Sequence, residues 1–495
     1  MKYLALITAL YFSTASCFAK LDLWMDAESK IGQTIELKEH RTQHCIRTKD
    51  SLGLMDHTGK IKRLSDCRVI GINNRGWIAI RILNKQKSWH VRKLIGPEGR
   101  IIPKTDKMEI VNFLTENRAP VRLVVEDNSG TGKNVIVADS LAFSFCTETG
   151  DILDARFDQV SQFNNGVAAV RIGKLVGFIG LDGKFLPNSK MVDCQFTQGV
   201  SQGYLAACRD GLWGYLDICG NWLIKPTFST AEAFHNDFAL VSSHSPTKTA
   251  VNSNSVTYID KTGKQFAQQF YSGKPFEEGY AAASVLSNDK KPTPLWGIID
   301  RKGQWVLEPK YSRIGPLIGS TRLLYDKDLV GIFSNGKITL QPKYHQIGEF
   351  SEGLASFQEP RSKSFGFLDR DGKIVVPAKF AFAGTFSEGL AAVSIYPAKP
   401  GDQCKIGFIN KQGAIGIAPK FGDLEASTEF NQEFVRFHDG LCLIPDRPYR
   451  LGKYSKSGFG FINKSGQWID QNVITFAYPF KMGQAVVRYY PISGR

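Results

Sequence analysis

The sequence predicts an all-β protein that is a tandem array of about eleven units, each of about 40 residues. One pattern recurs along the chain, most clearly in LWGYLDICGNWLI from Leu212, LWGIIDRKGQWVL from Leu295 and FGFLDRDGKIVV from Phe365. Apolar residues alternate with others on both sides of a turn sequence, and the 3.6-residue period of an amphipathic helix is scarce. We therefore expect units that each bury an apolar face against their neighbours.

Each unit opens with an apolar or aromatic residue followed by a glycine. This first glycine falls at Gly53, Gly177, Gly214, Gly297, Gly331, Gly366, Gly407 and Gly460, with Thr257, Ser144 and Lys93 at the equivalent place in weaker copies. We expect the preceding residue, such as Trp296, to lie in a core shared with the next unit. The glycine itself would let another stretch of chain approach closely.

A turn of the form D-x-x-G follows and joins two alternating runs into a β-hairpin. The Asp side chain can close the turn, and the final glycine would adopt the left-handed conformation. That glycine recurs at positions 59, 99, 150, 183, 220, 263, 303, 336, 372, 413 and 466.

The hairpin is followed by a proline, a basic residue and an aromatic residue, as in Pro309-Lys310-Tyr311. The sequence F-x-E-G-L-A-A-V comes next and is clearest at Phe386 to Val393. Its small residues alternate with larger apolar ones, which predicts a third, tightly packed strand in each unit.

These motifs closely resemble the WG repeat, a family found mainly in bacterial proteins. The resemblance covers residues 143–495 well and extends over 51–142 with poor copies, among which Gly53 to Lys60 is the clean hairpin. It implies an all-β repeat fold, and it implies no activity, because the family is defined by the repeat itself.

Two closures of the array are compatible with the sequence. The spacing between successive first glycines varies from 33 to 53 residues, which favours an open curved solenoid that tolerates insertions. The alternative is a closed β-propeller, whose blades have a similar length.

The N-terminus predicts export. Met1 and Lys2 precede an apolar stretch from Tyr3 to Phe12 and small residues before Ala19, so residues 1–19 form a signal peptide. Residues 20–50 are then a polar segment, 51–142 degenerate repeats or a cap, and 143–495 the WG-repeat array, with no later membrane span. The protein would be periplasmic or secreted; a lipoprotein acylated at Cys17 is the alternative.

Eight cysteines remain after cleavage, an even number in a chain bound for an oxidising compartment. Some disulfides are expected, and the sequence cannot choose among the possible pairings. Cys45 with Cys67, Cys194 with Cys208 and Cys404 with Cys442 would each close a short local loop. The alternative is that several are buried free thiols, which behave as small hydrophobes.

No catalytic motif or cofactor site is recognisable, so the sequence predicts a protein that is not an enzyme. The segment from Glu126 to Asn134 lacks the first glycine and the final Ser or Thr of a phosphate-binding loop. His40 and His44 have helical spacing for a shared metal, but no carboxylate completes a site. A hydrolase of envelope polymers, built from residues distant in sequence, remains the alternative from another class.

The charge predicts an anionic partner. The chain has 62 Lys and Arg against 47 Asp and Glu, and export makes nucleic acid an improbable partner. Five insertions between units carry ten basic and four acidic residues and should emerge on one edge of the array. The candidate binding residues lie in the most basic of them and are Arg447, Tyr449, Arg450, Lys453, Tyr454 and Lys456.

The sequence therefore favours an exported, non-enzymatic scaffold that binds a protein or an anionic envelope polymer or lipid through this edge. A solvated loop without a partner would explain the same basic segment. A periplasmic inhibitor or immunity-type protein is a further non-enzymatic alternative.

Overall fold

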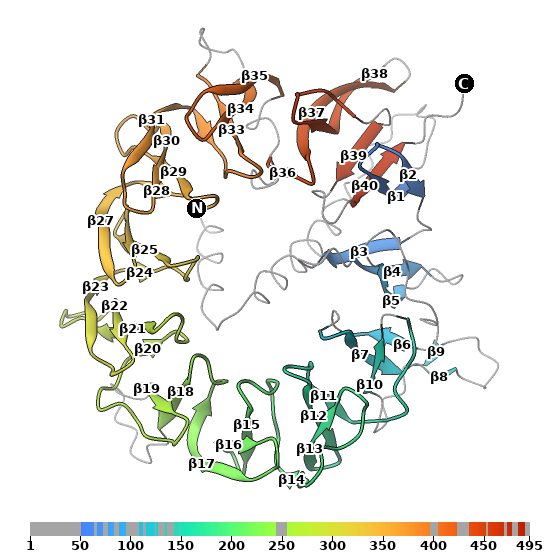
Figure 1. The fold of residues 1–495 in the computed structure, drawn as a ribbon, viewed down its shortest axis with the longest axis vertical. Helices are drawn as coiled ribbons and strands as arrows, with labels where there is room; N and C mark the ends of the chain where they lie inside the picture. Colours follow the sequence, from blue (N-terminus) through green and yellow to red (C-terminus); the bar gives the residue numbers. More distant parts are fainter. Residues whose placement is uncertain are drawn as a thin grey trace.

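The computed structural model describes residues 51–63, 67–72, 78–83, 89–95, 108–111, 115–123, 125–126, 134–135, 143–147, 149–243, 255–396, 404–422, 435–451, 454–469, 473–477 and 484–490. These residues form antiparallel sheets that follow one another around a ring (Figure 1). The all-β prediction is confirmed. Among the described residues, no helix has the length and apolar character needed to cross a bilayer.

The strands are short and follow one another in chain order around the ring. The first part of the chain contains β1 (Ser51–Asp56), β2 (Ile61–Arg63), β3 (Cys67–Ile72), β4 (Ile78–Leu83), β5 (Trp89–Ile95), β6 (Met108–Ile110), β7 (Arg118–Leu123), β8 (Val125–Glu126), β9 (Asn134–Val135) and β10 (Phe143–Thr147). The second part contains β11 (Gln159–Val160), β12 (Val167–Ile172), β13 (Leu175–Gly180), β14 (Val192–Asp193), β15 (Tyr204–Arg209), β16 (Leu212–Asp217), β17 (Trp222–Ala231), β18 (Phe238–Ser243) and β19 (Val256–Asp260). The third part contains β20 (Ser272–Gly273), β21 (Tyr280–Leu286), β22 (Pro294–Asp300), β23 (Trp305–Tyr311), β24 (Arg313–Ile314), β25 (Thr321–Asp326), β26 (Leu329–Ser334), β27 (Lys337–Tyr344), β28 (Gln346–Ile347), β29 (Leu354–Gln358), β30 (Phe365–Asp369) and β31 (Ile374–Phe380). The last part contains β32 (Phe382–Ala383), β33 (Leu390–Ser394), β34 (Ile406–Asn410), β35 (Ile415–Phe421), β36 (Phe437–His438), β37 (Leu441–Leu451), β38 (Tyr454–Asn463), β39 (Val473–Ala477) and β40 (Gln484–Tyr490).

The sheet β20-β21-β22-β23 shows the repeating arrangement. A two-residue strand lies innermost, and the strand after the E-G sequence, the W-G strand and the P-K-Y strand follow outward (Figure 1). The predicted hairpin and third strand are therefore present. The third strand of one unit pairs with the hairpin of the next, as β33 does with β34. The short innermost strand was not predicted from the sequence.

The D-x-x-G prediction is confirmed in atomic detail. Oδ1 of Asp300 accepts hydrogen bonds from the backbone N–H groups of Lys302 (2.8 Å) and Gln304 (2.9 Å). The N–H of Gly303 donates to the carbonyl of Asp300, and Gly303 has a φ of 77°. A side chain at this φ would be strained, which explains why glycine ends the turn.

The W-G glycine permits the predicted close approach. A Cβ atom on Gly331 would lie 2.4 Å from the carbonyl oxygen of Leu340 and 2.6 Å from the nitrogen of Pro342. The strand register shifts at this point between β26 and β27, so the outer strand bulges against the glycine. Glycine is required here by sterics and not by a ligand.

The P-K-Y step protects the outer edge of each sheet. Proline and lysine on an edge strand discourage pairing with another chain, because proline lacks a donor and lysine carries charge. Lys310 is exposed, and its Nζ lies 5.4 Å from the ring centroid of buried Tyr311. Lys343 and Tyr344 repeat the contact at 5.3 Å.

The hydrophobic core lies between neighbouring sheets, as expected for a repeat protein. One cluster joins Phe408 and Ile417 of one sheet to Phe437 and Ile462 of the next. Trp296, the residue before a first glycine, is 5% exposed and packs with residues of β25 and β26, including Phe333. The predicted shared core is confirmed.

The array closes on itself, in contrast to the open solenoid that the sequence favoured. β1 pairs with β40 over six residue pairs, including Gly53 with Val487, so β1 and β2 complete a sheet begun by β39 and β40. The ring of Figure 1 is thus joined at both ends, as in the propeller alternative. Variable insertions do not oppose closure because none of them lies in β1 or β40, the strands whose pairing joins the ring. The count of about eleven units stays a prediction.

Six of the described cysteines are free thiols. Cys146, Cys194 and Cys442 are buried, Cys208 and Cys404 are half-buried, and Cys219 is exposed. The predicted disulfides Cys194–Cys208 and Cys404–Cys442 are therefore not formed in this structure, and buried thiols fill core positions instead. The predicted pair Cys45–Cys67 cannot be assessed, because Cys45 lies outside the described residues.

Candidate functional site

Each sheet has two ends, one that carries the turns and one that carries the insertions. The E-G and D-x-x-G turns lie at one end, because each central strand runs between a turn and an insertion. Four of the five insertions join the second strand of a sheet to its third, as residues 287–293 join β21 to β22. The fifth joins β18 to β19, the equivalent pair in a five-stranded sheet. They therefore emerge at the opposite end, as the sequence predicted for one edge.

The most basic insertion is a β-hairpin and not an irregular loop. β37 pairs with β38, and its register places Tyr449 opposite Lys456, Arg450 opposite Ser455 and Leu451 opposite Tyr454. Arg447 lies opposite Gly458 beyond a register shift. Five of the six predicted binding residues thus share one two-stranded ladder, and Lys453 lies outside the described residues. We name residues 445–457 the basic hairpin.

Carboxylates at the E-G turns link consecutive sheets. The carboxylate of Glu352 accepts the backbone N–H of Gly389 in the next sheet at 3.1 Å and pairs with Lys411 Nζ at 3.1 Å. Glu388 repeats this with Gly440 at 3.1 Å and Lys464 at 3.0 Å. These acids are therefore engaged in holding the ring together.

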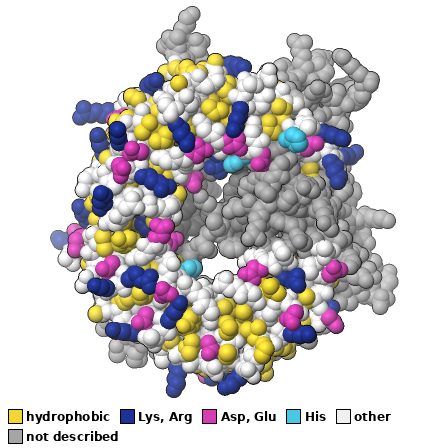
Figure 2. All heavy atoms as spheres, viewed as in Figure 1, with side chains coloured by type: hydrophobic (Ala, Val, Ile, Leu, Met, Phe, Trp, Pro, Cys, Tyr) yellow, Lys and Arg dark blue, Asp and Glu magenta, His cyan; other side chains and the backbone are white. Residues whose placement is uncertain are grey.

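The environment of Glu388 shifts its pKa. Burial raises the pKa of the carboxyl, but the hydrogen bonds from Lys464 and Gly440 outweigh this and hold it below its ordinary value. Figure 2 shows one face of the ring, with several Asp, Glu and His side chains near the inner rim and many Lys and Arg side chains around the outer rim.

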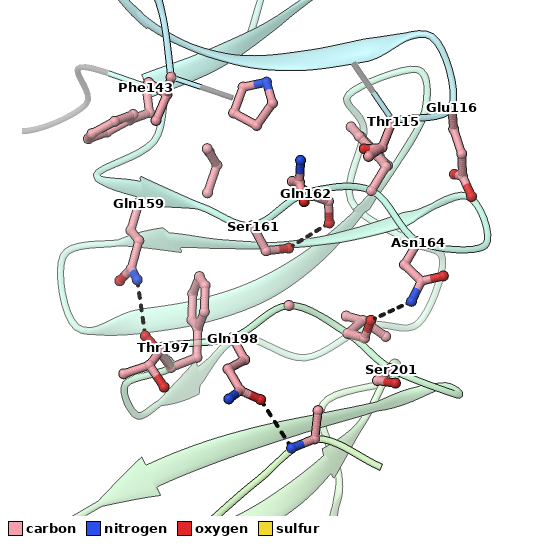
Figure 3. A pocket seen from close by; sticks show the side chains of 18 of the residues that line it. Thr115, Glu116, Phe143, Gln159, Ser161, Gln162, Asn164, Thr197, Gln198 and Ser201 are labelled. Carbon is pink, nitrogen blue, oxygen red and sulfur yellow. Dashed lines mark hydrogen bonds between the residues drawn. The ribbon is translucent and has the colours of Figure 1, made fainter. Parts of the chain in front are cut away.

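A pocket of about 730 Å³ lies on the inner wall. Its lining comes from β7 and the connection before it, from β10, from β11 and the turn after it, and from the segments just before β15 and β18. Figure 3 shows amide and hydroxyl side chains around it, among them Gln159, Ser161, Asn164, Gln198 and Ser201. Most are fixed by bonds to the backbone: Gln159 Nε2 donates to the Phe196 carbonyl at 3.0 Å, and Asn164 Nδ2 to the Val200 carbonyl at 3.0 Å. The size suits a small-molecule site.

The titratable groups of this inner-wall pocket are Glu116, Glu232 and His235. Burial raises the pKa of Glu232, and nearby Lys274 opposes that rise. Burial also lowers the pKa of His235, which favours its neutral form, while Glu277 opposes the change. In the described part of the chain, no group of three or more His, Cys, Asp or Glu is placed to hold a metal ion. His40 and His44 lie outside that part.

Sequence reasoning missed this pocket because its residues come from four successive units and form no motif. One signal was available at Glu232. The backbone N–H of residue 232 bonds to Leu240, as those of Gly315 and Gly348 bond to Leu323 and Ser356. A carboxylate thus stands where later units have Gly315, Gly348 and Gly384, although Ser161 and Lys274 occupy the same position in two other units.

Comparison with protein families decides what this repeat is. The model of the WG-containing repeat matches residues 152–175, 213–243, 257–288, 296–319, 334–359, 365–396 and 406–437. The chain belongs to the WG-repeat family. In this WG-repeat protein, each matched segment except the first extends from the W-G hairpin toward or into the following F-x-E-G-L-A-A-V strand. No curated protein matches the chain significantly.

Solved structures resemble this WG-repeat protein only distantly. A eukaryotic initiation factor is 11% identical, with 74% of this chain and 95% of that chain covered and a TM-score of 0.33. The WD40 domain of Neurospora crassa Pan2 is 11% identical, with 66% and 95% covered and a TM-score of 0.23. AztD from Citrobacter koseri is 14% identical, with 54% and 88% covered and a TM-score of 0.21. At these scores the likenesses support no conclusion about this chain.

Proposed function

We propose that this WG-repeat protein is an exported, non-enzymatic scaffold that binds an anionic envelope component or a protein through the basic hairpin. The observation that carries the proposal is the ladder of β37 and β38, which places Arg447, Arg450 and Lys456 at fixed register positions on two paired strands. A loop would hold these cations in many arrangements, whereas a ladder keeps their spacing fixed, and preorganisation reduces the entropy lost on binding.

The location of the basic hairpin at the insertion end of the sheets supports the same function. The carboxylates of Glu352 and Glu388 belong to turns at the opposite end and are already paired with lysines there. The five insertions carry a net charge of six positive units, from ten basic and four acidic residues. An anionic surface approaching the insertion end therefore meets uncompensated positive charge.

Export is proposed from residues 1–19, whose short apolar stretch and small residues before Ala19 fit a signal peptide. The mature protein would act in the periplasm or outside the cell, or at the membrane if Cys17 is acylated. Fractionation of cells that express the full chain tests this, and a cytosolic product that retains residues 1–19 would refute it.

Binding is tested with vesicles that contain phosphatidylglycerol in phosphatidylcholine and with R447E/R450E/K456E. We expect the unaltered protein to sediment with these vesicles at low salt and the variant not to do so. The matched control is K184E/K302E/K373E, which makes the same charge change at three exposed lysines near D-x-x-G turns. Equal loss in both variants would show an effect of net charge alone and refute the hairpin as the site.

Crosslinking in the native envelope distinguishes the kinds of partner. A single protein captured by the unaltered chain and lost in R447E/R450E/K456E supports a protein-binding scaffold or an inhibitor. Retention on purified wall polymer followed by release of soluble fragments would instead support the envelope hydrolase and contradict a non-enzymatic role.

A further inference from the structure

The inner-wall pocket has the opposite charge from the molecule as a whole. The chain carries a net charge of +15, yet the residues that line this pocket include Glu116 and Glu232 and no lysine or arginine. The pocket also lies on the inner wall, away from the insertion at residues 445–457 that forms the basic hairpin. It is therefore a second candidate site, and an anionic ligand of the hairpin would be repelled from it.

Glu232 is the unusual residue of the pocket. No hydrogen bond or ion pair to its carboxylate is present among the described residues, although the side chain is partly buried. The charge of nearby Lys274 opposes the effect of burial on this carboxylate, and the Lys274 Nζ lies 5.9 Å from the ring centroid of Trp296. A desolvated carboxylate without a partner costs stability, and such costs are concentrated at functional sites.

Further polar groups of the pocket lack protein partners. The hydroxyl of Thr115 is buried and makes no hydrogen bond. Gln198 uses its Oε1 to accept the backbone N–H of Ala233 at 3.0 Å, and no bond from its amide nitrogen is present in the described part of the chain. The amide nitrogen of Gln198 could therefore hydrogen-bond to a ligand without breaking any existing contact.

The wall around these groups is fixed. Ser201 Oγ donates to the Phe234 carbonyl at 2.7 Å, and Asn236 Nδ2 donates to the Phe276 carbonyl at 2.8 Å, so successive sheets are tied together beside the pocket. Glu116 Oε2 accepts the backbone N–H of Gly166 at 2.8 Å. A ligand would thus meet a preformed cavity, which lowers the cost of binding.

We propose that the inner-wall pocket binds an organic ammonium ion whose carrier also has hydroxyl or amide groups. The ammonium group would pair with the Glu232 carboxylate and replace the partner that the protein does not supply. The hydroxyl or amide groups of the carrier would bond to the amide nitrogen of Gln198. No covalent step is involved.

Calorimetric titration with three sugar oligomers tests the proposal. The probes are the glucosamine trimer, which carries ammonium groups at mildly acidic pH, the neutral N-acetylglucosamine trimer and the anionic galacturonic acid trimer. We expect the glucosamine trimer to bind and each of the others to bind at least about tenfold more weakly, because only the first completes the ion pair. Equal binding of the three, preference for the anionic trimer or no binding of the glucosamine trimer would overturn the proposal.

The variant E232Q separates binding from folding. It should weaken binding of the glucosamine trimer by about tenfold while its melting temperature stays equal or rises, because it removes an unpartnered charge. The control E308Q makes the same charge change on the exposed outer strand β23 and should leave the affinity unchanged. Unaltered affinity in E232Q, or the same loss in E308Q, would refute the assignment of Glu232.

Discussion

Arg322 Nη2 lies 3.0 Å from Glu277 Oε2 of the neighbouring sheet, and the arginine side chain is 2% exposed. The same isolated bridge closes the turn in each unit, and it shows which residues are equivalent. Thr321 corresponds to Leu390, so Arg322 occupies the position of Ala391 in that later unit. By the same bridge, Glu277 occupies the position of Ser387. The two departures from the repeat therefore compensate each other across one sheet interface.

This pair makes a prediction about stability. E277S should destabilise the protein by about 3–5 kcal/mol, because it leaves the buried guanidinium of Arg322 without its carboxylate. The double variant E277S/R322A, which restores the residues of the later unit, should recover most of that loss. Urea denaturation followed by tryptophan fluorescence measures both. A double variant less stable than E277S would contradict the compensation.

Two glycine variants test the steric role of the W-G motif. G331A should destabilise the protein by about 1–3 kcal/mol, because its Cβ would overlap the backbone of Leu340 and Pro342. Gly353 has a φ of 90° but open space around a Cβ, so G353A should cost only the strain of the left-handed conformation, about 1–2 kcal/mol. Thermal melting compares them, and a G331A protein as stable as the unaltered one would refute the close approach.

The lowered pKa of Glu388 predicts that the free energy of unfolding falls in acid. Its folded pKa lies below the ordinary value, so its contribution is fully present above the unfolded pKa and is lost as the pH falls through the folded pKa. E388Q should therefore reduce stability near neutrality and flatten the fall below about pH 4. Melting temperatures from neutral to acidic pH measure this, with E308Q as the control. A parallel downward shift of the whole curve would contradict the linkage.

The thiols should differ strongly in reactivity. Burial raises the pKa of Cys146 and of Cys194 to about 12, which keeps both as unreactive thiols, whereas Cys219 is exposed. Maleimide labelling of the native protein, located by mass spectrometry, should modify Cys219 first and the buried Cys146, Cys194 and Cys442 last. Denatured, non-reduced protein should yield all six described thiols, and a shortfall would indicate a disulfide among them.

The local structure of each unit could be predicted from the sequence because short-range sterics impose it. The glycine at Gly303 is required by a left-handed turn, and the glycine at Gly331 by a bulge of the adjacent strand, so both leave a visible period. The alternation around Trp296 likewise follows from burial on one side of a strand. The inter-sheet core and the insertion end follow from these patterns.

Closure and the pocket could not be predicted in the same way. The pairing of Gly53 with Val487 joins residues at opposite ends of the chain, and the spacing of neighbouring units carries no information about it. The inner-wall pocket depends on side chains such as Gln159 and Glu232 that meet only after the ring has formed. The basic hairpin was located by composition, but its pairing depends on the register of β37 and β38.

Closure of the ring is the central structural claim, because the position of the basic hairpin and of the pocket follows from it. The pairing of β1 with β40 joins β1 and β2 to the sheet that continues through β39 to β38, so Lys62 of β2 and Lys464 after β38 belong to adjoining parts of the closed ring. Lysine-specific crosslinking of the monomer, followed by mass spectrometry, should therefore recover a link between Lys62 and Lys464. Lys373 and Lys411, which lie in consecutive sheets, provide the control link. A monomer that yields the control link but none between residues 60–62 and Lys464 would contradict the closed ring and support an open array.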